Sequence, residues 1–271
     1  MRGFTLIEMS IVLVIIGLIV GGVLVGQDLV RAAEVRAQIT QIEKYNQAVN
    51  TFRGKYGYLP GDMIPTAATQ FGFSVGAGFD GVSVGHRNGD GLIDDWPYPF
   101  QLGQGKCENA AFWQDLSFVN LIDGAFPNSG IPAANCNGGT ALTLSGSLIG
   151  AYFPPAKIGR GNYVYAYEVN SINYYGVAAI TSTVNSAIMT SNATIPVMQA
   201  YNMDAKIDDG IPNAGKVVAT YINNSWTLQN APNTATSGGT AASCYDTTSN
   251  TYSITPNGGS GANCALSFQF Q

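Results

Sequence analysis

The chain begins with a long, almost purely apolar segment. Across residues 4–26 every residue is apolar or small apart from Thr5, Glu8 and Ser10, and Glu8 carries the only charge. A helix of about 20 residues can cross the hydrocarbon core of a bilayer, so the segment is long enough to span a membrane. Three explanations compete: a cleaved secretory signal, an ordinary transmembrane anchor, and an anchor that also forms a filament.

The position of Glu8 separates these explanations. A secretory signal has a basic region and a small-residue cleavage site after its apolar core, but here Arg2 is the only base and no A-x-A sequence follows. An ordinary anchor leaves unexplained a carboxylate within the hydrocarbon, which costs several kcal/mol unless it has a partner. Cleavage after Gly3 would give Phe4 a positively charged amino group. In a staggered bundle of identical helices, Glu8 of one copy would then meet the Phe4 ammonium of its neighbour.

These residues carry a specific resemblance. The string GFTLIE at residues 3–8, followed by MSIVLVIIGLIVGGVLVG, resembles the cleavage and methylation signature of type IV prepilins and type II secretion pseudopilins. The resemblance covers roughly the first sixty residues. It implies that a membrane-embedded prepilin peptidase cuts after Gly3 and that the new N-terminal Phe4 is methylated. It also implies that Glu8, together with Thr5, directs the docking of subunits.

The resemblance implies a function, partners and a location as well. The chain would be a structural subunit of a pilus or of a secretion pseudopilus, and not an enzyme. Its partners would be copies of itself in a helical polymer, other pilins, the prepilin peptidase and methyltransferase, and the inner membrane. The precursor and the subunit pool are expected in the inner membrane, with the head in the periplasm or on the cell surface.

A second helical pattern follows the apolar segment. Apolar residues recur at steps of three and four, which is typical of one face of an amphipathic helix. They are Val35, Ile39, Ile42, Tyr45, Val49, Phe52 and Tyr56. We therefore expect one helix from the membrane to about Tyr56, on the order of 80 Å long at 1.5 Å per residue. Gly57, Pro60 and Gly61 should end it.

Short β-prone stretches alternate with turn residues in the rest of the chain. The strand candidates are 163–169, 174–181, 216–221, 225–229 and 265–270. We expect an α+β fold of the pilin type, in which the second half of the long helix packs on an antiparallel sheet. The expected divisions are a leader (1–3), a transmembrane assembly helix (4–26), an amphipathic helix that enters the head (27–56) and a globular extracytoplasmic head (57–271).

The composition suits an exported protein. Only 11% of the residues are charged, against about a quarter in a typical soluble domain. The net charge is −5, which leaves no basic field to neutralise phosphates, so nucleic acid is not an expected partner.

The four cysteines all lie in the C-terminal body, and none of them belongs to a CxxC pair, which argues against a zinc cluster. Outside the cytoplasm an even number at these spacings indicates two disulfides, with three possible connectivities. We favour the sequential pairing, in which Cys107 binds Cys136 and Cys244 binds Cys264. The alternative is four free, buried thiols.

One segment of the head, residues 86–95, resembles the first half of a calcium-binding loop, with oxygen-bearing side chains at alternate positions and a turn glycine. The ligands would be Asn88, Asp90 and Asp94 or Asp95. The first position holds His86 and the twelfth holds Pro97, so the segment is not an EF-hand. The alternative is a surface turn rich in Asn and Asp. Calcium is the one cofactor that the sequence suggests.

A second acidic segment, residues 204–212, is similar to a KIDDG-x-P segment of large pilin-like proteins. It would either cap a short helix or offer another cation site, and we favour the cap. His86 is the only histidine and lies in a Gly-rich turn without a nucleophile elbow. The sequence also has no phosphate loop and no HExxH motif.

Two other functions stay open from sequence. The chain could be a minor or tip subunit that acts as an adhesin or binds cargo, since its head is larger than a compact pilin needs. A membrane-tethered hydrolase would need head carboxylates that the sequence does not single out.

Overall fold

The computed structural model describes residues 6–73, 75, 87–94, 107–126, 144–184, 188–223, 228–230 and 239–270. The helices are α1 (Leu6–Tyr56), α2 (Pro65–Gln70), α3 (Cys107–Phe118), η2 (Gly146–Leu148), α4 (Ile149–Tyr152), α5 (Val197–Ile207) and η3 (Pro256–Gly259). The longer strands are β2 (Tyr163–Val169), β3 (Ile172–Val184), β4 (Ile188–Asn192) and β12 (Leu266–Gln269). The shorter strands are β1 (Leu144–Ser145), β5 (Ile195–Pro196), β6 (Val217–Val218), β7 (Thr220–Ile222), β8 (Leu228–Asn230), β9 (Tyr245–Asp246), β10 (Thr251–Tyr252) and β11 (Ala262–Cys264).

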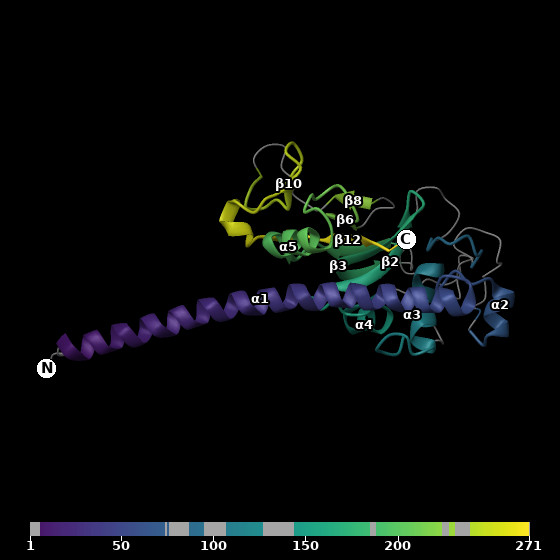
Figure 1. The fold of residues 1–271 in the computed structure, drawn as a ribbon, viewed down its shortest axis with the longest axis horizontal. Helices are drawn as coiled ribbons and strands as arrows, with labels where there is room; N and C mark the ends of the chain where they lie inside the picture. The colour runs from purple at the N-terminus through teal and green to yellow at the C-terminus, as the bar shows by residue number, and fades with distance from the viewer. Residues whose placement is uncertain are drawn as a thin grey trace.

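The long helix α1 is present as predicted, with 51 residues and a length of about 77 Å at 1.5 Å per residue. Its first half projects alone from the molecule, and its second half lies along the head (Figure 1). Five residues of the predicted apolar stripe are buried, and Ile39 and Tyr56 are partly buried against the core. The helix ends where Gly57, at φ +80°, donates its N–H to the carbonyl of Arg53. This left-handed conformation is one that glycine adopts without strain.

The sheet is antiparallel and is built around β3. Both β2 and β12 pair with the first part of this strand, while β1 and β4 pair with its second part. The order β1-β3-β12-β6, with β2 and β4 also on β3, gives six strands. A long helix followed by an antiparallel sheet is the predicted α+β, pilin-like layout.

The turn between β2 and β3 shows how local chemistry sets the register. Asn170 and Ser171 both have positive φ, at 55° and 62°. Two successive residues of this kind match the twist of the flanking strands in a two-residue hairpin. The turn pairs Val169 with Ile172 and Tyr163 with Ala178, so the predicted strand 163–169 has the expected bounds.

Of the helices of the head, only a short one next to residues 204–212 was expected, and α2, α3 and α4 were not predicted. The helix α3 packs against α1 and the sheet, and the Trp113 ring lies 4.8 Å from that of Tyr45 and 4.9 Å from that of Phe112. In the same core Tyr175 of β3 stacks on Phe270, with ring centroids 4.2 Å apart. The helix α5 packs on α1 and lies above it in Figure 1, whereas α4 lies below it. The head therefore covers one face of the second half of α1, where Val35, Ile42 and Phe52 are buried.

Candidate functional site

The first half of α1 has an apolar surface that no other part of the described chain covers. Its large side chains are 49–88% exposed from Leu6 to Val30, and the first buried residue of the helix is Val35. An 18-residue stretch of α1 has a mean hydropathy of 2.8, and none of it is buried inside the molecule. By length and composition, α1 can therefore cross a membrane. Exposed apolar surface of this size marks a membrane or a protein interface.

Glu8 lies in the first turn of this apolar half. Its helical neighbours Ile7, Met9 and Ile11 are 70%, 49% and 56% exposed. The carboxylate therefore stands on a surface that is otherwise suited to hydrocarbon. Gly3, Phe4 and Thr5 lie outside the described residues, so their parts in processing and assembly stay predictions.

Polar contacts fix the head on α1 directly after its apolar first half. Gln38 accepts a hydrogen bond from the backbone N–H of Ile158 at 3.0 Å, and Gln41 accepts one from that of Lys157 at 2.9 Å. One helical turn before Gln38, Glu34 accepts hydrogen bonds from Arg160 at 3.2 Å and from Gln199 of α5 at 2.8 Å. Since both glutamines are buried, these bonds hold the head and the helix in one fixed orientation.

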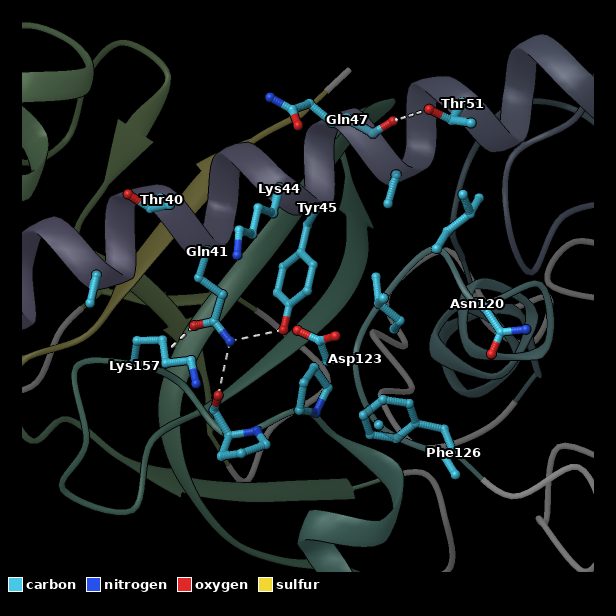
Figure 2. Close-up of a pocket in the computed structure, with 18 of the residues that line it drawn as sticks. Thr40, Gln41, Lys44, Tyr45, Gln47, Thr51, Asn120, Asp123, Phe126 and Lys157 are labelled. Atoms are coloured by element: carbon cyan, nitrogen blue, oxygen red, sulfur yellow. Dashed lines mark hydrogen bonds between the residues drawn. The ribbon is translucent and has the colours of Figure 1, made fainter.

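A groove of about 930 Å³ runs beside the second half of α1 (Figure 2). One wall is the helix face that carries Thr40, Lys44 and Gln47, and the other wall is formed by residues 120–126 and the loop around Lys157. Gln41 and Tyr45 lie at its floor, where Gln41 donates hydrogen bonds to the Tyr45 hydroxyl at 2.8 Å and to the Pro155 carbonyl at 2.9 Å. Grooves of this volume are large enough for a ligand.

The predicted calcium segment forms a tight loop at 87–94. Asn88 donates a side-chain hydrogen bond to Asp90 at 2.8 Å, and Asp90 accepts the N–H of Leu92 at 2.9 Å. Asp94 lies beside Glu108 of α3, which accepts the Asp94 N–H at 3.2 Å. The backbone of Asp94 is thus held against α3. Asp95 lies outside the described residues, and calcium at this loop stays a prediction.

Two carboxylates that the sequence analysis did not single out organise this loop. Asp62 accepts the N–H groups of Gly89 at 2.6 Å and Gly91 at 2.8 Å. Glu108 accepts the N–H of Asn88 at 3.3 Å besides that of Asp94. Burial raises the pKa of the Asp62 carboxyl to about 7, and it raises the pKa of Glu108 well above its usual value, with the charges of Asp94 and Asp62 adding to the effect.

A buried ion pair holds the start of the loop. The two terminal nitrogens of Arg87, Nη1 and Nη2, donate to Asp115 of α3, each at 2.8 Å, and both side chains are only 1% exposed. Asp115 also accepts the N–H of Gly61, at 2.8 Å. One carboxylate therefore ties the loop, α3 and the turn after α1 together.

The raised pKa values predict that the head is more stable in mild acid. Below about pH 4 Asp62 and Glu108 are protonated in both the folded and the unfolded chain. As the pH rises toward 7 they ionise first in the unfolded chain, so the unfolded state binds fewer protons and stability falls by up to ~1.4 kcal/mol per pH unit for each group. Thermal melts of the detergent-solubilised chain between pH 4 and pH 7 should show a falling Tm.

Substitution of Glu108 tests whether the buried carboxyl groups, and not the other acidic residues, cause this fall in Tm. Glu108→Gln replaces the carboxyl group by an amide of the same shape that stays neutral at every pH. The decrease in Tm between pH 4 and pH 7 should therefore be smaller in this variant. The control is Asp123→Asn, which changes an exposed carboxylate and should leave the slope unchanged. An equal slope in native and Glu108→Gln proteins would contradict the assignment.

The second acidic segment closes α5. Asp208 follows the helix as its C-cap and donates its N–H to the Asp204 carbonyl at 2.7 Å. The Asp204 side chain accepts the N–H of Gly210 at 3.1 Å, and Asp209 accepts that of Ile211 at 2.8 Å. Among the described residues these three acids are the ones whose oxygens lie close enough together for a shared metal ion, within 4.8 Å. Their oxygens nevertheless accept hydrogen bonds from groups of the protein, namely from Gly210, Ile211, Lys216 and the Tyr252 hydroxyl. The segment therefore forms the turn that follows a short helix.

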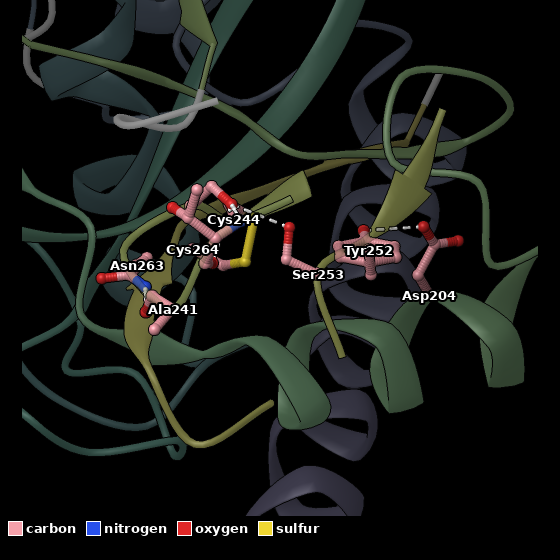
Figure 3. Close-up of a disulfide and its surroundings, with 9 residues drawn as sticks. Asp204, Ala241, Cys244, Tyr252, Ser253, Asn263 and Cys264 are labelled. Carbon is pink, nitrogen blue, oxygen red and sulfur yellow. Dashed lines mark hydrogen bonds between the residues drawn. A yellow bond between two sulfur atoms is a disulfide. The ribbon is translucent and has the colours of Figure 1, made fainter. Parts of the chain in front are cut away.

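The disulfide Cys244–Cys264 links the end of the chain to the β9–β10 hairpin (Figure 3). This is the second bridge of the predicted sequential pairing. Cys107 is also disulfide-bonded, and Cys136, its predicted partner, lies outside the described residues. Next to the bridge, the Tyr252 hydroxyl donates to Asp204 at 2.8 Å. The hairpin is thus fixed to α5 on one side and to β11 on the other.

Three comparisons with known proteins complete these observations. Residues 1–24 match the family model of the prokaryotic N-terminal methylation motif, which is the signature of type IV pilins and pseudopilins. The comparison with curated proteins gave no match, and the comparison with solved structures gave none either. The match covers the apolar segment and not the head. The motif indicates a structural protein that prepilin peptidase processes and that is anchored in a membrane as a precursor.

Proposed function

We propose that this chain, whose N-terminus carries the type IV pilin signature, is a structural subunit of a type IV pilus or of a type II secretion pseudopilus. The observation that carries the proposal is the coincidence of that signature with the bare apolar half of α1. A helix of this kind needs lipid before assembly and other helices after it. A soluble enzyme or binding protein would need neither lipid nor other helices around it.

In the proposed subunit, residues 1–3 are the leader, 4–26 the transmembrane and assembly helix, 27–56 the part of the helix that enters the head, and 57–271 the extracytoplasmic head. The peptidase cuts after Gly3, and Phe4 becomes the methylated N-terminus. The Glu8 carboxylate then docks against the Phe4 ammonium of an adjacent copy, with Thr5 at the same contact. Within an apolar bundle this attraction is far stronger than in water, so it favours one register of packing.

The proposed location follows from the same division of the chain. The apolar helix holds the precursor and the subunit pool in the inner membrane, and the head lies in the periplasm or on the cell surface. An oxidising compartment of this kind supports the disulfide between Cys244 and Cys264.

The first test is the mass of the mature protein. We expect chain purified from the membrane of a host with prepilin peptidase to lack Met1, Arg2 and Gly3, and to carry one added methyl group on Phe4. Intact-mass and N-terminal peptide mass spectrometry measure both. Gly3→Ala should block the cut, because the new side chain occupies the cleavage position. A mature N-terminus at Met1 or after Gly26 would sink the proposal.

A second candidate is a minor or tip subunit whose head binds a surface or a cargo. The groove in Figure 2 favours it, because a subunit that only builds a fibre has no need of an open groove of about 930 Å³. Immunogold labelling of a head epitope distinguishes the two candidates. A main subunit should be labelled along the whole fibre, and a tip subunit at one end.

A further inference from the structure

The groove beside α1 gathers positive charge in an acidic protein. The chain has a net charge of −5 and only twelve Lys and Arg residues, and three of these, Arg36, Lys44 and Lys157, line this groove. All three are exposed. Within the described ranges no carboxylate forms an ion pair with any of the three, whereas Arg31, Arg87 and Arg160 each have one. The charge of the groove is therefore available to a ligand.

The charge lies at one end of the groove. On the helix, Arg36 and Lys44 come before Gln47 and Thr51. The Lys157 N–H donates a hydrogen bond to the side chain of Gln41, which lies between Arg36 and Lys44 on the helix, so Lys157 is close to these two residues. Figure 2 shows Asp123 beside the Tyr45 hydroxyl, near the middle of the groove, and Asn120 and Phe126 toward the other end. The groove thus has a positive end, one carboxylate near its middle and a neutral end.

The shape of the groove suits an extended chain. Arg36, Thr40, Lys44, Gln47 and Thr51 are spaced by four, four, three and four residues, so they lie on one face of α1. From Arg36 to Thr51 the helix rises by about 22 Å. An extended peptide covers the same length with about six or seven residues. The amide and hydroxyl side chains along this face can both donate to and accept from a peptide backbone.

We propose that this groove binds an extended acidic peptide, with two or three carboxylates beside Arg36, Lys44 and Lys157 and a neutral stretch along Gln47 and Thr51. A long polyanion fits less well, because the protein as a whole is acidic and the described residues that line the far end of the groove include no basic side chain. The site does not involve Glu8, so it is tested separately from the proposed filament contact.

The test uses the full chain in detergent and a fluorescent heptapeptide with three aspartates followed by four neutral residues. Fluorescence anisotropy should give saturable binding that weakens with added salt. The double variant Lys44→Gln/Lys157→Gln should bind roughly tenfold more weakly, as expected for the loss of two exposed ion pairs. Both side chains are exposed, so the variant should melt at the native temperature.

The matched control is Lys206→Gln/Lys216→Gln, which makes the same change in net charge away from the groove. It should bind the peptide like the native chain. Asp123→Asn should tighten binding of the peptide, because it removes the one carboxylate among the described residues that line the groove.

Four results would overturn the proposal. They are the absence of binding, an equal loss of binding in the control, equal binding of a peptide with lysines in place of the aspartates, and tighter binding of a sulfated oligosaccharide or single-stranded oligonucleotide with the same lysine dependence. The last result would assign the groove to a polyanion. None of them bears on cleavage after Gly3, so the proposed function would stand.

Discussion

The Glu8→Ala variant should be made, inserted into the membrane and cleaved after Gly3 like the native chain, and yet be at least roughly tenfold depleted in filaments. In the proposed assembly the substitution leaves the Phe4 ammonium of the neighbouring copy in an apolar bundle without its counter-charge. Breaking a buried pair by removing one partner costs about 3–5 kcal/mol, and every ~1.4 kcal/mol is a factor of ten in an equilibrium. The fraction of tagged variant in sheared filaments, relative to the membrane pool, measures the effect.

The matched control is Glu43→Ala. Glu43 is an exposed carboxylate on the same helix, beyond the apolar half, so its loss should leave incorporation within a factor of about two, as for a surface charge. Glu8→Gln keeps the size of the side chain and removes its charge. It should behave like Glu8→Ala if charge decides assembly, and like the native chain if only packing matters. Normal incorporation of both Glu8 variants would count against the pairing.

The chain shows which parts of a fold local sequence can predict. The helix α1 was predictable from end to end, because an apolar run and a stripe at steps of three and four each act within a few residues. The strands β2 and β3 were also predicted, as 163–169 and 174–181, since aromatic and branched residues are frequent in both. Both signals depend on neighbours in the sequence, and the structure confirms both.

The helix α3 escaped prediction for a physical reason. Ten of its twelve residues, 107–116, are buried, including polar ones such as Glu108 and Asp115. A helix that is buried all round has no polar face, so it has no periodic pattern to find. The roles of Gln38 and Gln41 were missed for a related reason. Their buried amides accept hydrogen bonds from backbone groups of a loop that is more than a hundred residues away in the sequence.

The candidate sites divide in the same way. The processing motif depends on adjacent residues, and it was found from sequence. The groove depends on Lys44 and Lys157, which only the docking of the head on α1 brings together. The loop at 87–94 was noticed for its acids, but its order comes from Asp62 and Glu108 in other segments. Long-range contacts of this kind leave no local signal.

Among single changes in the head, Asp115→Asn should have the largest effect on stability. It leaves the Arg87 guanidinium buried without its bidentate partner, and arginine cannot shed its charge as a carboxylate can. Removing one partner of a buried pair costs about 3–5 kcal/mol, so the Tm of the detergent-solubilised chain should fall by roughly 10 °C or more. The asparagine oxygen can still accept the N–H of Gly61, so the loss reports on the charge.

Two further variants check that the pair is the cause. Arg87→Met should be less harmful than Asp115→Asn, because the remaining Asp115 carboxylate still accepts the N–H of Gly61. The double variant Arg87→Met/Asp115→Asn buries no charge at this position, so it should recover most of the lost stability. If the two single losses simply add in the double variant, the side chains do not act as a pair, and the loop at 87–94 must be held chiefly by Asp62 and Glu108.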